Sequence, residues 1–265
     1  MYSFNYQKAK SVAEASGVLG AKPDAKILAG GQSLIAAMKL RLANPSDIVD
    51  IGLLPDLAGI KVEGNIVTIG AMTRHAQVAA SAEVKKAIPA LASLAGGIGD
   101  RMVRNMGTIG GSVANNDPAA DYPAGLVALG ATVITDKRKI SADEFFKGMY
   151  ETALQAGEII TAVAFPVPKR ASYMKFKNPA SRYAIVGVFI ADFGSSVRVA
   201  VTGAAAGVFR VPEMEKALAA KFAPESVAGI KVAEDNLNSD MHAKADYRSH
   251  LITVMAKRGV EAALK

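Results

Sequence analysis

The sequence contains no cysteine. A disulfide, a thiol nucleophile and thiolate-bound zinc or iron–sulfur centres are therefore excluded within this chain, so any such centre must belong to another subunit. Histidine is scarce as well, because the only three, His75, His242 and His250, are scattered without the spacing of metal ligands. We therefore expect no metal site in this chain.

Long apolar segments are missing too. No uncharged apolar run reaches the roughly 18 residues that a membrane span requires. The N-terminal "MYSFNYQKAK" also lacks the apolar centre of a signal peptide. These features predict a soluble, cytoplasmic protein with no membrane span.

The composition predicts a globular protein with a scattered positive charge. The chain has 265 residues, of which 51% are hydrophobic, so it can bury a substantial core. Lys and Arg number 31 against 24 Asp and Glu, which gives a formal net charge of +7. The basic residues form only short groups, such as 136–139 and 255–259, without the interleaved aromatic residues that single-stranded nucleic acid requires. We therefore expect no nucleic-acid partner.

The first 168 residues alternate between helix and strand patterns. Ser11 is suited to cap a helix that ends at Gly20, and "AKILAGG" is typical of a short strand that runs into a double glycine. We predict helices at 11–20, 32–45 and 84–99, strands at 25–31, 47–52 and 64–71, a helix followed by a strand within 123–135, and a strand at 158–168.

The pattern changes after Pro166 and Pro168. Beyond them we predict consecutive antiparallel strands at 171–177, 183–193 and 197–205, then helices at 212–222, 224–237 and 246–264. The expected fold class is therefore α+β, with one domain over 1–168, in subdomains of about 1–55 and 56–168, and a smaller domain over 169–265.

One segment between the predicted elements is unusual. "RNMGTIGGSVANNDPAADYPAG" (104–125), which we predict to be a loop, is rich in Gly, Asn and Asp, and no Lys, Arg or His occurs from Asn105 to Asp136. No glycine run here ends in the Lys of a phosphate-binding P-loop, and no GxGxxG follows a strand as in a Rossmann site. The acidic residues also lack the alternation and distal Glu of a calcium loop. A polar or anionic ligand would have to be held here without a cation.

Two glycine segments could share such a ligand. In "AGGQSL" (29–34) the N–H groups of Gly31, Gln32 and Ser33 can converge on anionic oxygens, with a helix dipole from about Ser33 aimed at the same point. In "GTIGGS" (107–112) the Thr and Ser hydroxyls add donors to a second set of exposed amides. Two donor-rich segments without lysine suit a shared pyrophosphate.

These segments resemble those of the FAD-binding medium subunits of the molybdenum hydroxylases, the family of xanthine dehydrogenase and aerobic carbon monoxide dehydrogenase. The resemblance covers nearly the whole chain. It rests on five motifs in family order: "AGGQSLIAAMKLRLANPSDIVDIG" (29–52), "GAMTRHAQV" (70–78), "GDRMVRNMGTIGGSVANNDPAADYPA" (99–124), "GEIITAVAFP" (157–166) and "KFKNPASRYAIVGV" (175–188).

The resemblance implies a two-subdomain FAD-binding domain of the vanillyl-alcohol oxidase and p-cresol methylhydroxylase type, followed by the C-terminal domain of this subunit family. It places FAD between the subdomains, with the pyrophosphate on two loops and with Asn115 and Asp121 on ribityl or adenosine hydroxyls. Lys175 would lie near the flavin, although Lys177 competes for this role. Tyr183 would cover one ring face, unless it is only the first residue of a core strand. The implied cofactor-binding residues are Ala29, Gly30, Gly31, Gln32, Ser33, Leu34, Ile98, Thr108, Ile109, Gly110, Gly111, Ser112, Asn115, Asp121, Ile160, Lys175 and Tyr183. The resemblance gives no role to Thr73 or His75.

The resemblance also implies a function. A large subunit with a molybdenum cofactor would oxidise the substrate, a small subunit with [2Fe–2S] clusters would pass single electrons on, and FAD in this chain would deliver them to an external acceptor, in a dimer of heterotrimers. A cation such as Lys175 would favour the anionic reduced flavin, and no catalytic residue is expected in this chain. Two alternatives stay open: a free-standing FAD oxidase of the same fold, and a nucleotide-binding adaptor without redox turnover.

Overall fold

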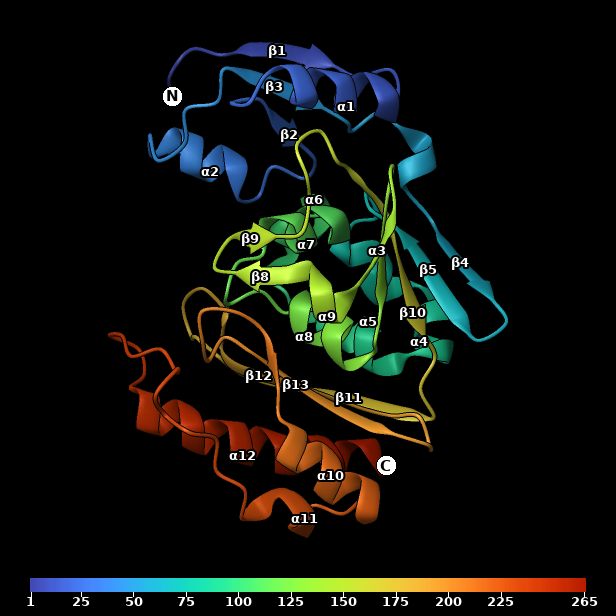
Figure 1. Ribbon diagram of the computed structural model, residues 1–265, viewed down its shortest axis with the longest axis vertical. Helices are drawn as coiled ribbons and strands as arrows, with labels where there is room; N and C mark the ends of the chain where they lie inside the picture. Colours follow the sequence, from blue (N-terminus) through green and yellow to red (C-terminus); the bar gives the residue numbers. More distant parts are fainter.

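The three larger of four β-sheets lie one after another along the long axis of the protein in the computed structural model, which describes all 265 residues (Figure 1). The N-terminal sheet and the C-terminal helices occupy opposite ends of the molecule. This mixed arrangement of helices and sheets agrees with the α+β class predicted from the sequence.

The first sheet is small and parallel. Its strands follow the order β1 (Asn5–Lys8), β3 (Asp47–Asp50) and β2 (Lys26–Leu28). Helix α1 (Val12–Ala21) begins where predicted, because the Ser11 hydroxyl accepts a hydrogen bond from Glu14 N–H at 3.1 Å. Helix α2 (Leu34–Lys39) has only six residues and is shorter than the predicted 32–45, since Arg41 adopts a left-handed backbone with φ of 60°.

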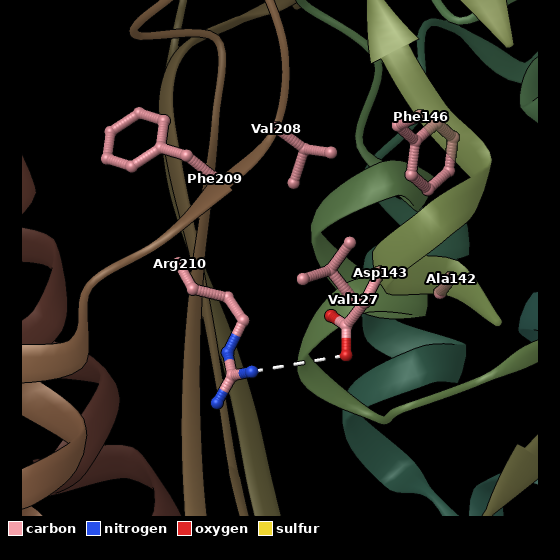
Figure 2. Close-up of a pocket in the computed structure, with 7 residues that line it drawn as sticks. All are labelled: Val127, Ala142, Asp143, Phe146, Val208, Phe209 and Arg210. Carbon is pink, nitrogen blue, oxygen red and sulfur yellow. Dashed lines mark ion pairs between the residues drawn. The ribbon is translucent and has the colours of Figure 1, made fainter.

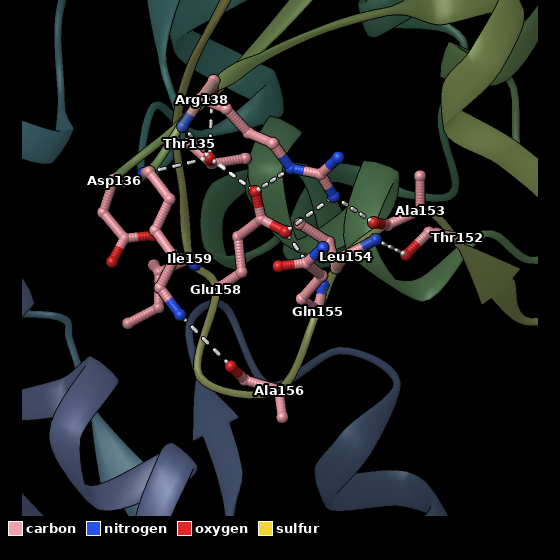
Figure 3. Close-up of polar contacts among 11 residues, drawn as sticks. Thr135, Asp136, Arg138, Thr152, Ala153, Leu154, Gln155, Ala156, Glu158 and Ile159 are labelled. Atoms are coloured by element: carbon pink, nitrogen blue, oxygen red, sulfur yellow. Dashed lines mark hydrogen bonds and ion pairs between the residues drawn. The ribbon is translucent and has the colours of Figure 1, made fainter.

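The second sheet is antiparallel, and the strand that comes last in the sequence, β10 (Ile160–Pro166), lies at its centre. The order is β4 (Ile60–Glu63), β5 (Ile66–Gly70), β10, β6 (Thr132–Thr135) and β7 (Lys139–Ser141), with the short 3-10 helix η1 (Pro55–Leu57) before β4. The turn that leads into β10 is fixed by Glu158, whose carboxylate accepts from Arg138 Nε at 2.9 Å and from Thr135 Oγ1 at 2.8 Å (Figure 3). Helix α9 (Ala142–Phe145) and the hairpin β8 (Phe146–Gly148) and β9 (Glu151–Thr152) follow β7.

Six short helices pack beside this sheet: α3 (His75–Ala80), α4 (Ala82–Ala87), α5 (Pro89–Gly96), α6 (Arg101–Met106), α7 (Ile109–Asn115) and α8 (Tyr122–Ala128). The single helix predicted at 84–99 is wrong. Pro89 has no N–H and disfavours a helical conformation at Ile88, so it ends α4 and begins α5. The prediction of a loop over 104–125 is also wrong, because α7 and most of α8 lie within it.

The third sheet is antiparallel, as predicted, and is covered on both faces. Its order is β11 (Arg170–Lys177), β12 (Ala184–Asp192), β13 (Val197–Thr202) and β14 (Phe209–Arg210). All nine residues of β12 are buried: Phe189 packs into the core of the second sheet, and Ile190 packs into a separate core with the C-terminal helices. Those helices are α10 (Pro212–Ala220), α11 (Glu225–Ala228) and α12 (Ala245–Ala263).

The helix predicted at 224–237 is mostly absent. Only α11 forms, and the carbonyls of Ile230 and Val232 instead accept hydrogen bonds from the hydroxyls of Thr253 and Ser249 on α12. None of the helices is both long and apolar enough to cross a bilayer.

Candidate functional site

The first glycine segment presents unpaired backbone donors. Five consecutive backbone N–H groups, from Gly30 to Leu34, donate no hydrogen bond within the chain. Gly31 has a φ of 70°, a left-handed conformation that favours glycine, and this turns the chain from β2 into α2. Because α2 has only six residues, its dipole is small, so these unpaired N–H groups are the main donors that the segment offers.

The second glycine segment is bonded differently from our expectation. The N–H groups of Ile109 and Gly110 donate to the carbonyls of Thr73 and Ala71, at 3.1 and 2.8 Å. The Gly111 N–H donates to Thr108 Oγ1, which caps α7. The prediction of a second set of exposed amides is therefore wrong.

Helix α7 nevertheless presents polar side chains to solvent. Ser112 and Asn115 are partly exposed and lie three residues apart, on one face of the helix. Neither side chain makes a hydrogen bond within the chain, so both are available to a ligand. Gly111 precedes Ser112, and a Cβ atom there would lie 2.9 Å from Thr108 Oγ1.

The two glycine segments meet in space. A Cβ atom at Gly30 would lie 2.7 Å from Gly107 Cα and 2.9 Å from the Met106 carbonyl carbon, and one at Gly111 would lie 3.7 Å from Ala29 Cβ. Residues 71–75 hold the second glycine segment in place. The carbonyls of Ala71 and Thr73 accept hydrogen bonds from N–H groups of this segment, and His75 N–H donates to the Gly107 carbonyl at 3.0 Å. The expectation that the segments form one site is consistent with this close approach.

A buried ion pair lies where the third sheet contacts α5 and α8. Lys175 Nζ is 2.9 Å from Asp121 Oδ1 and donates to the Gly97 carbonyl at 2.9 Å. Tyr173, which the sequence interpretation missed, donates to Asp121 at 2.5 Å. Burial raises the pKa of the Asp121 carboxyl above its ordinary value, against the opposing effects of Lys175 and Tyr173.

This geometry bears on two expectations. Asp121, predicted to bind sugar hydroxyls, is only 4% exposed, and its two oxygens already accept hydrogen bonds from Tyr173 and Lys175. Lys175 and Lys177 lie on the same side of β11, but only Lys175 reaches into the interior, since its side chain is 8% exposed and Lys177 is solvent-exposed.

Tyr183 precedes β12 and is 47% exposed, so it is not a core strand residue. It borders a cavity of about 400 Å³, together with Asp117 and Tyr150. Burial and the nearby Asp117 carboxylate raise the pKa of Tyr183. Tyr150 and Arg182 have left-handed backbones, with φ of 57° and 64°, and such strain in non-glycine residues concentrates at ligand sites.

Ile160 and Ile98 are the remaining predicted residues. Ile160 is buried at the start of β10, next to the Thr161 carbonyl that accepts Ala71 N–H. Ile98 is half-buried between α5 and α6, and its carbonyl accepts from Arg104. A separate cavity of about 370 Å³ between α9 and β14, where Arg210 faces Asp143, contains none of the predicted residues (Figure 2).

Comparison with known proteins identifies the two parts of the chain. Residues 2–168 match the FAD binding domain in molybdopterin dehydrogenase, and residues 171–263 match the CO dehydrogenase flavoprotein C-terminal domain. The chain is 36% identical to the nicotine 6-hydroxylase medium subunit of Paenarthrobacter nicotinovorans, over 97% of this chain and 96% of the relative. It is also 36% identical to the carbon monoxide dehydrogenase medium chain of Hydrogenophaga pseudoflava, over 98% and 96%.

The fold agrees with these sequence matches. Reconstituted CO dehydrogenase from Oligotropha carboxidovorans contains a chain that superposes with a TM-score of 0.92 at 34% identity, over 99% of this chain and 98% of that one. Full-length similarity in sequence and in structure therefore shows that this chain belongs to the FAD-binding medium subunits of the molybdenum hydroxylase family, that its cofactor is FAD, and that it is an oxidoreductase subunit.

Proposed function

We propose that this chain transfers electrons between [2Fe–2S] clusters of a partner subunit and an external acceptor, within a complex whose molybdenum subunit oxidises the substrate. The observation that carries the proposal is the approach of the two glycine segments, where Gly30 packs against Gly107 beside five unpaired N–H groups. Such a cradle suits a pyrophosphate, which carries many acceptor oxygens and needs close backbone approach. Bound FAD would supply the redox chemistry, and the chain would bind and orient it.

The residues divide this work between them. Ala29 to Leu34 would hold the pyrophosphate, and Thr108 to Ser112, with Asn115, would complete the site from α7. Ile98 and Ile160 would provide apolar surface near the cofactor. Lys175 would hold a positive charge near the flavin, where it favours the anionic reduced form. Asp121 would fix Lys175 in place, and Tyr183 would cover one face of the ring.

Several finer features belong to the same proposal. The iron–sulfur clusters must lie in another chain, because this one has no cysteine. We further propose a cytoplasmic dimer of heterotrimers, a domain boundary near residue 168, subdomains at about 1–55 and 56–168, and a binding domain of the p-cresol methylhydroxylase type. Relatives of equal identity are named for nicotine and for carbon monoxide, so the medium subunit does not disclose the substrate.

Absorbance and composition of the native complex test the proposal. We expect the purified chain to carry flavin bands and to co-purify with molybdenum and iron. A colourless chain that takes up no added FAD would support the adaptor alternative and overturn the proposal. A yellow chain with full substrate turnover, free of iron and molybdenum, would support the free-standing oxidase.

A further inference from the structure

His75 is the first residue of α3 and lies at the meeting point of the two glycine segments. Its side chain is 5% exposed and packs against Tyr122, with ring centroids 5.4 Å apart. A Cβ atom at Gly107 would lie 2.7 Å from His75 Nε2, so only the missing side chain of this glycine leaves room for the imidazole. The ring therefore lies directly beneath the backbone that Gly30 touches.

The imidazole has unused hydrogen-bonding capacity. His75 Nδ1 is sealed from solvent and has no partner, and the same holds for the Tyr122 hydroxyl. His75 Nε2 also makes no hydrogen bond within the chain, but it is not sealed and it faces Gly107. Buried polar atoms without partners are rare, because each costs the lost hydration of the group, so a pair of them in contact requires an explanation.

The charge state decides what the ring can offer. Burial, reinforced by the Arg104 guanidinium, lowers the pKa of His75 to about 4, so the ring is neutral at pH 7. A neutral ring carries one N–H. With the proton on Nδ1, a donor would be sealed without an acceptor. With the proton on Nε2, the donor lies on the ring atom that is not sealed and that faces Gly107, which favours this tautomer. Arg104, bonded to the Ile98 and Gly99 carbonyls, and Tyr122 are the ionisable groups that face the ring.

We propose that the Nε2–H of neutral His75 donates a hydrogen bond to an oxygen of the FAD pyrophosphate. The inference rests on the proposed function, because it needs the pyrophosphate between the two glycine segments. The His75 side chain would supply a donor on the side of the site where the N–H groups of Ile109, Gly110 and Gly111 already donate hydrogen bonds within the chain. It also explains how this side can hold an anion without Lys: a neutral donor avoids burying a cation in the apoprotein.

The test compares two substitutions. His75→Phe keeps the ring shape without either nitrogen, whereas His75→Gln keeps an N–H near the Nε2 position. We expect the dissociation constant for FAD to rise by about 10- to 100-fold in His75→Phe, the usual effect of losing a hydrogen bond to a charged acceptor. His75→Gln should stay within a few-fold of wild type, and so should His250→Phe, a control on the exposed face of α12.

The thermal stability of the apoprotein distinguishes a role of His75 in FAD binding from a role in supporting the fold. The His75→Phe apoprotein should melt at or above the wild-type temperature, because the substitution removes a sealed nitrogen without a partner. In ¹⁵N-labelled protein, one histidine should show the neutral Nε2–H tautomer and shift on addition of FAD. Wild-type FAD affinity in His75→Phe would overturn the inference, and so would a joint loss of affinity and apoprotein stability. If the wild-type chain binds no FAD, the proposed function itself fails.

Discussion

Replacing Gly30 with alanine should separate the two glycine segments and weaken FAD binding. The new Cβ atom would lie 2.7 Å from Gly107 Cα and 2.9 Å from the Met106 carbonyl carbon. The Met106 carbonyl oxygen would lie nearer still. Ordinary contact begins at about 3.4 Å, so the segments must move apart by roughly 1 Å. Side-chain rotation cannot relieve this overlap, because the nearest atoms belong to the backbone.

The backbone on the far side is held firmly. Gly107 N–H donates to the Val103 carbonyl at 2.7 Å, and the Gly107 carbonyl accepts from His75 N–H at 3.0 Å. Overpacking of this kind costs about 1–3 kcal/mol. In a chain of this size we expect the melting temperature of the apoprotein to fall by roughly 2–10 °C. If FAD binding requires the two segments to return to their wild-type separation, the same free energy is lost from binding. The dissociation constant for FAD should then rise by about 10- to 100-fold.

Fluorescence titration of the apoprotein with FAD and thermal unfolding would measure both effects. Gly17→Ala is the matched control, because a Cβ atom at Gly17 in α1 meets nothing within 4 Å. Alanine there should leave FAD binding unchanged and stabilise the helix by about 0.5–1 kcal/mol. A Gly30→Ala variant with wild-type FAD affinity and melting temperature would refute the close approach of the two segments.

Three further substitutions test other parts of the site and fold. Gly111→Val should strongly reduce FAD retention, because its side chain would crowd the first glycine segment; normal flavin content in the folded variant would contradict this. Asp121→Asn should lower the free energy of unfolding by about 3–5 kcal/mol in urea titrations, since Lys175 then stays buried without its counterion; a loss below about 1 kcal/mol would count against a buried pair. Glu158→Gln should lower the free energy of unfolding by about 2 kcal/mol at pH 7, a value reduced to allow for the 40% exposure of Arg138. Because the pKa of Glu158 is lowered to about 2, this advantage of the wild type should be present above pH 4.5 and vanish as the pH falls toward 2; a difference that persists at pH 2 would show another cause.

Elements whose stability is local could be predicted from the sequence. Helix α1 has its Ser11 cap, and β12 has a continuous apolar run because both faces of the third sheet are covered. The break at Pro89 could also have been predicted, because proline restricts the residue before it. These features depend on neighbours in the sequence, which periodicity and capping rules describe.

Elements that depend on distant contacts could not be predicted in the same way. Helix α7 forms although two glycines fall in its first turn, because Gly110 N–H bonds to the Ala71 carbonyl and Thr108 caps the helix. The segment after α11 stays irregular because hydroxyls of α12 satisfy its carbonyls. In both cases a decisive partner, Ala71 for α7 and the hydroxyls of α12 for the segment after α11, lies outside the local sequence.

The candidate site shows the same division. The glycine segments were identified from composition and resemblance, but the bonding of their amides depends on segment 71–75. Tyr173 was missed, although it precedes Lys175 by two residues in a strand and must therefore share its face. Strand periodicity around a candidate lysine was the signal that could have found it.

The central position of β10 has a consequence for synthesis of the chain. Gly30 and Gly107 are 77 residues apart, and β10 joins β5 to β6 only once residue 166 has been made. Lys175 comes later still, from the third sheet. As the chain leaves the ribosome, the first sheet emerges well before the rest of its cofactor cradle, and contacts over such separations are slow to form. A cradle that needs both glycine segments and Lys175 is therefore complete only after about two thirds of the chain has been made.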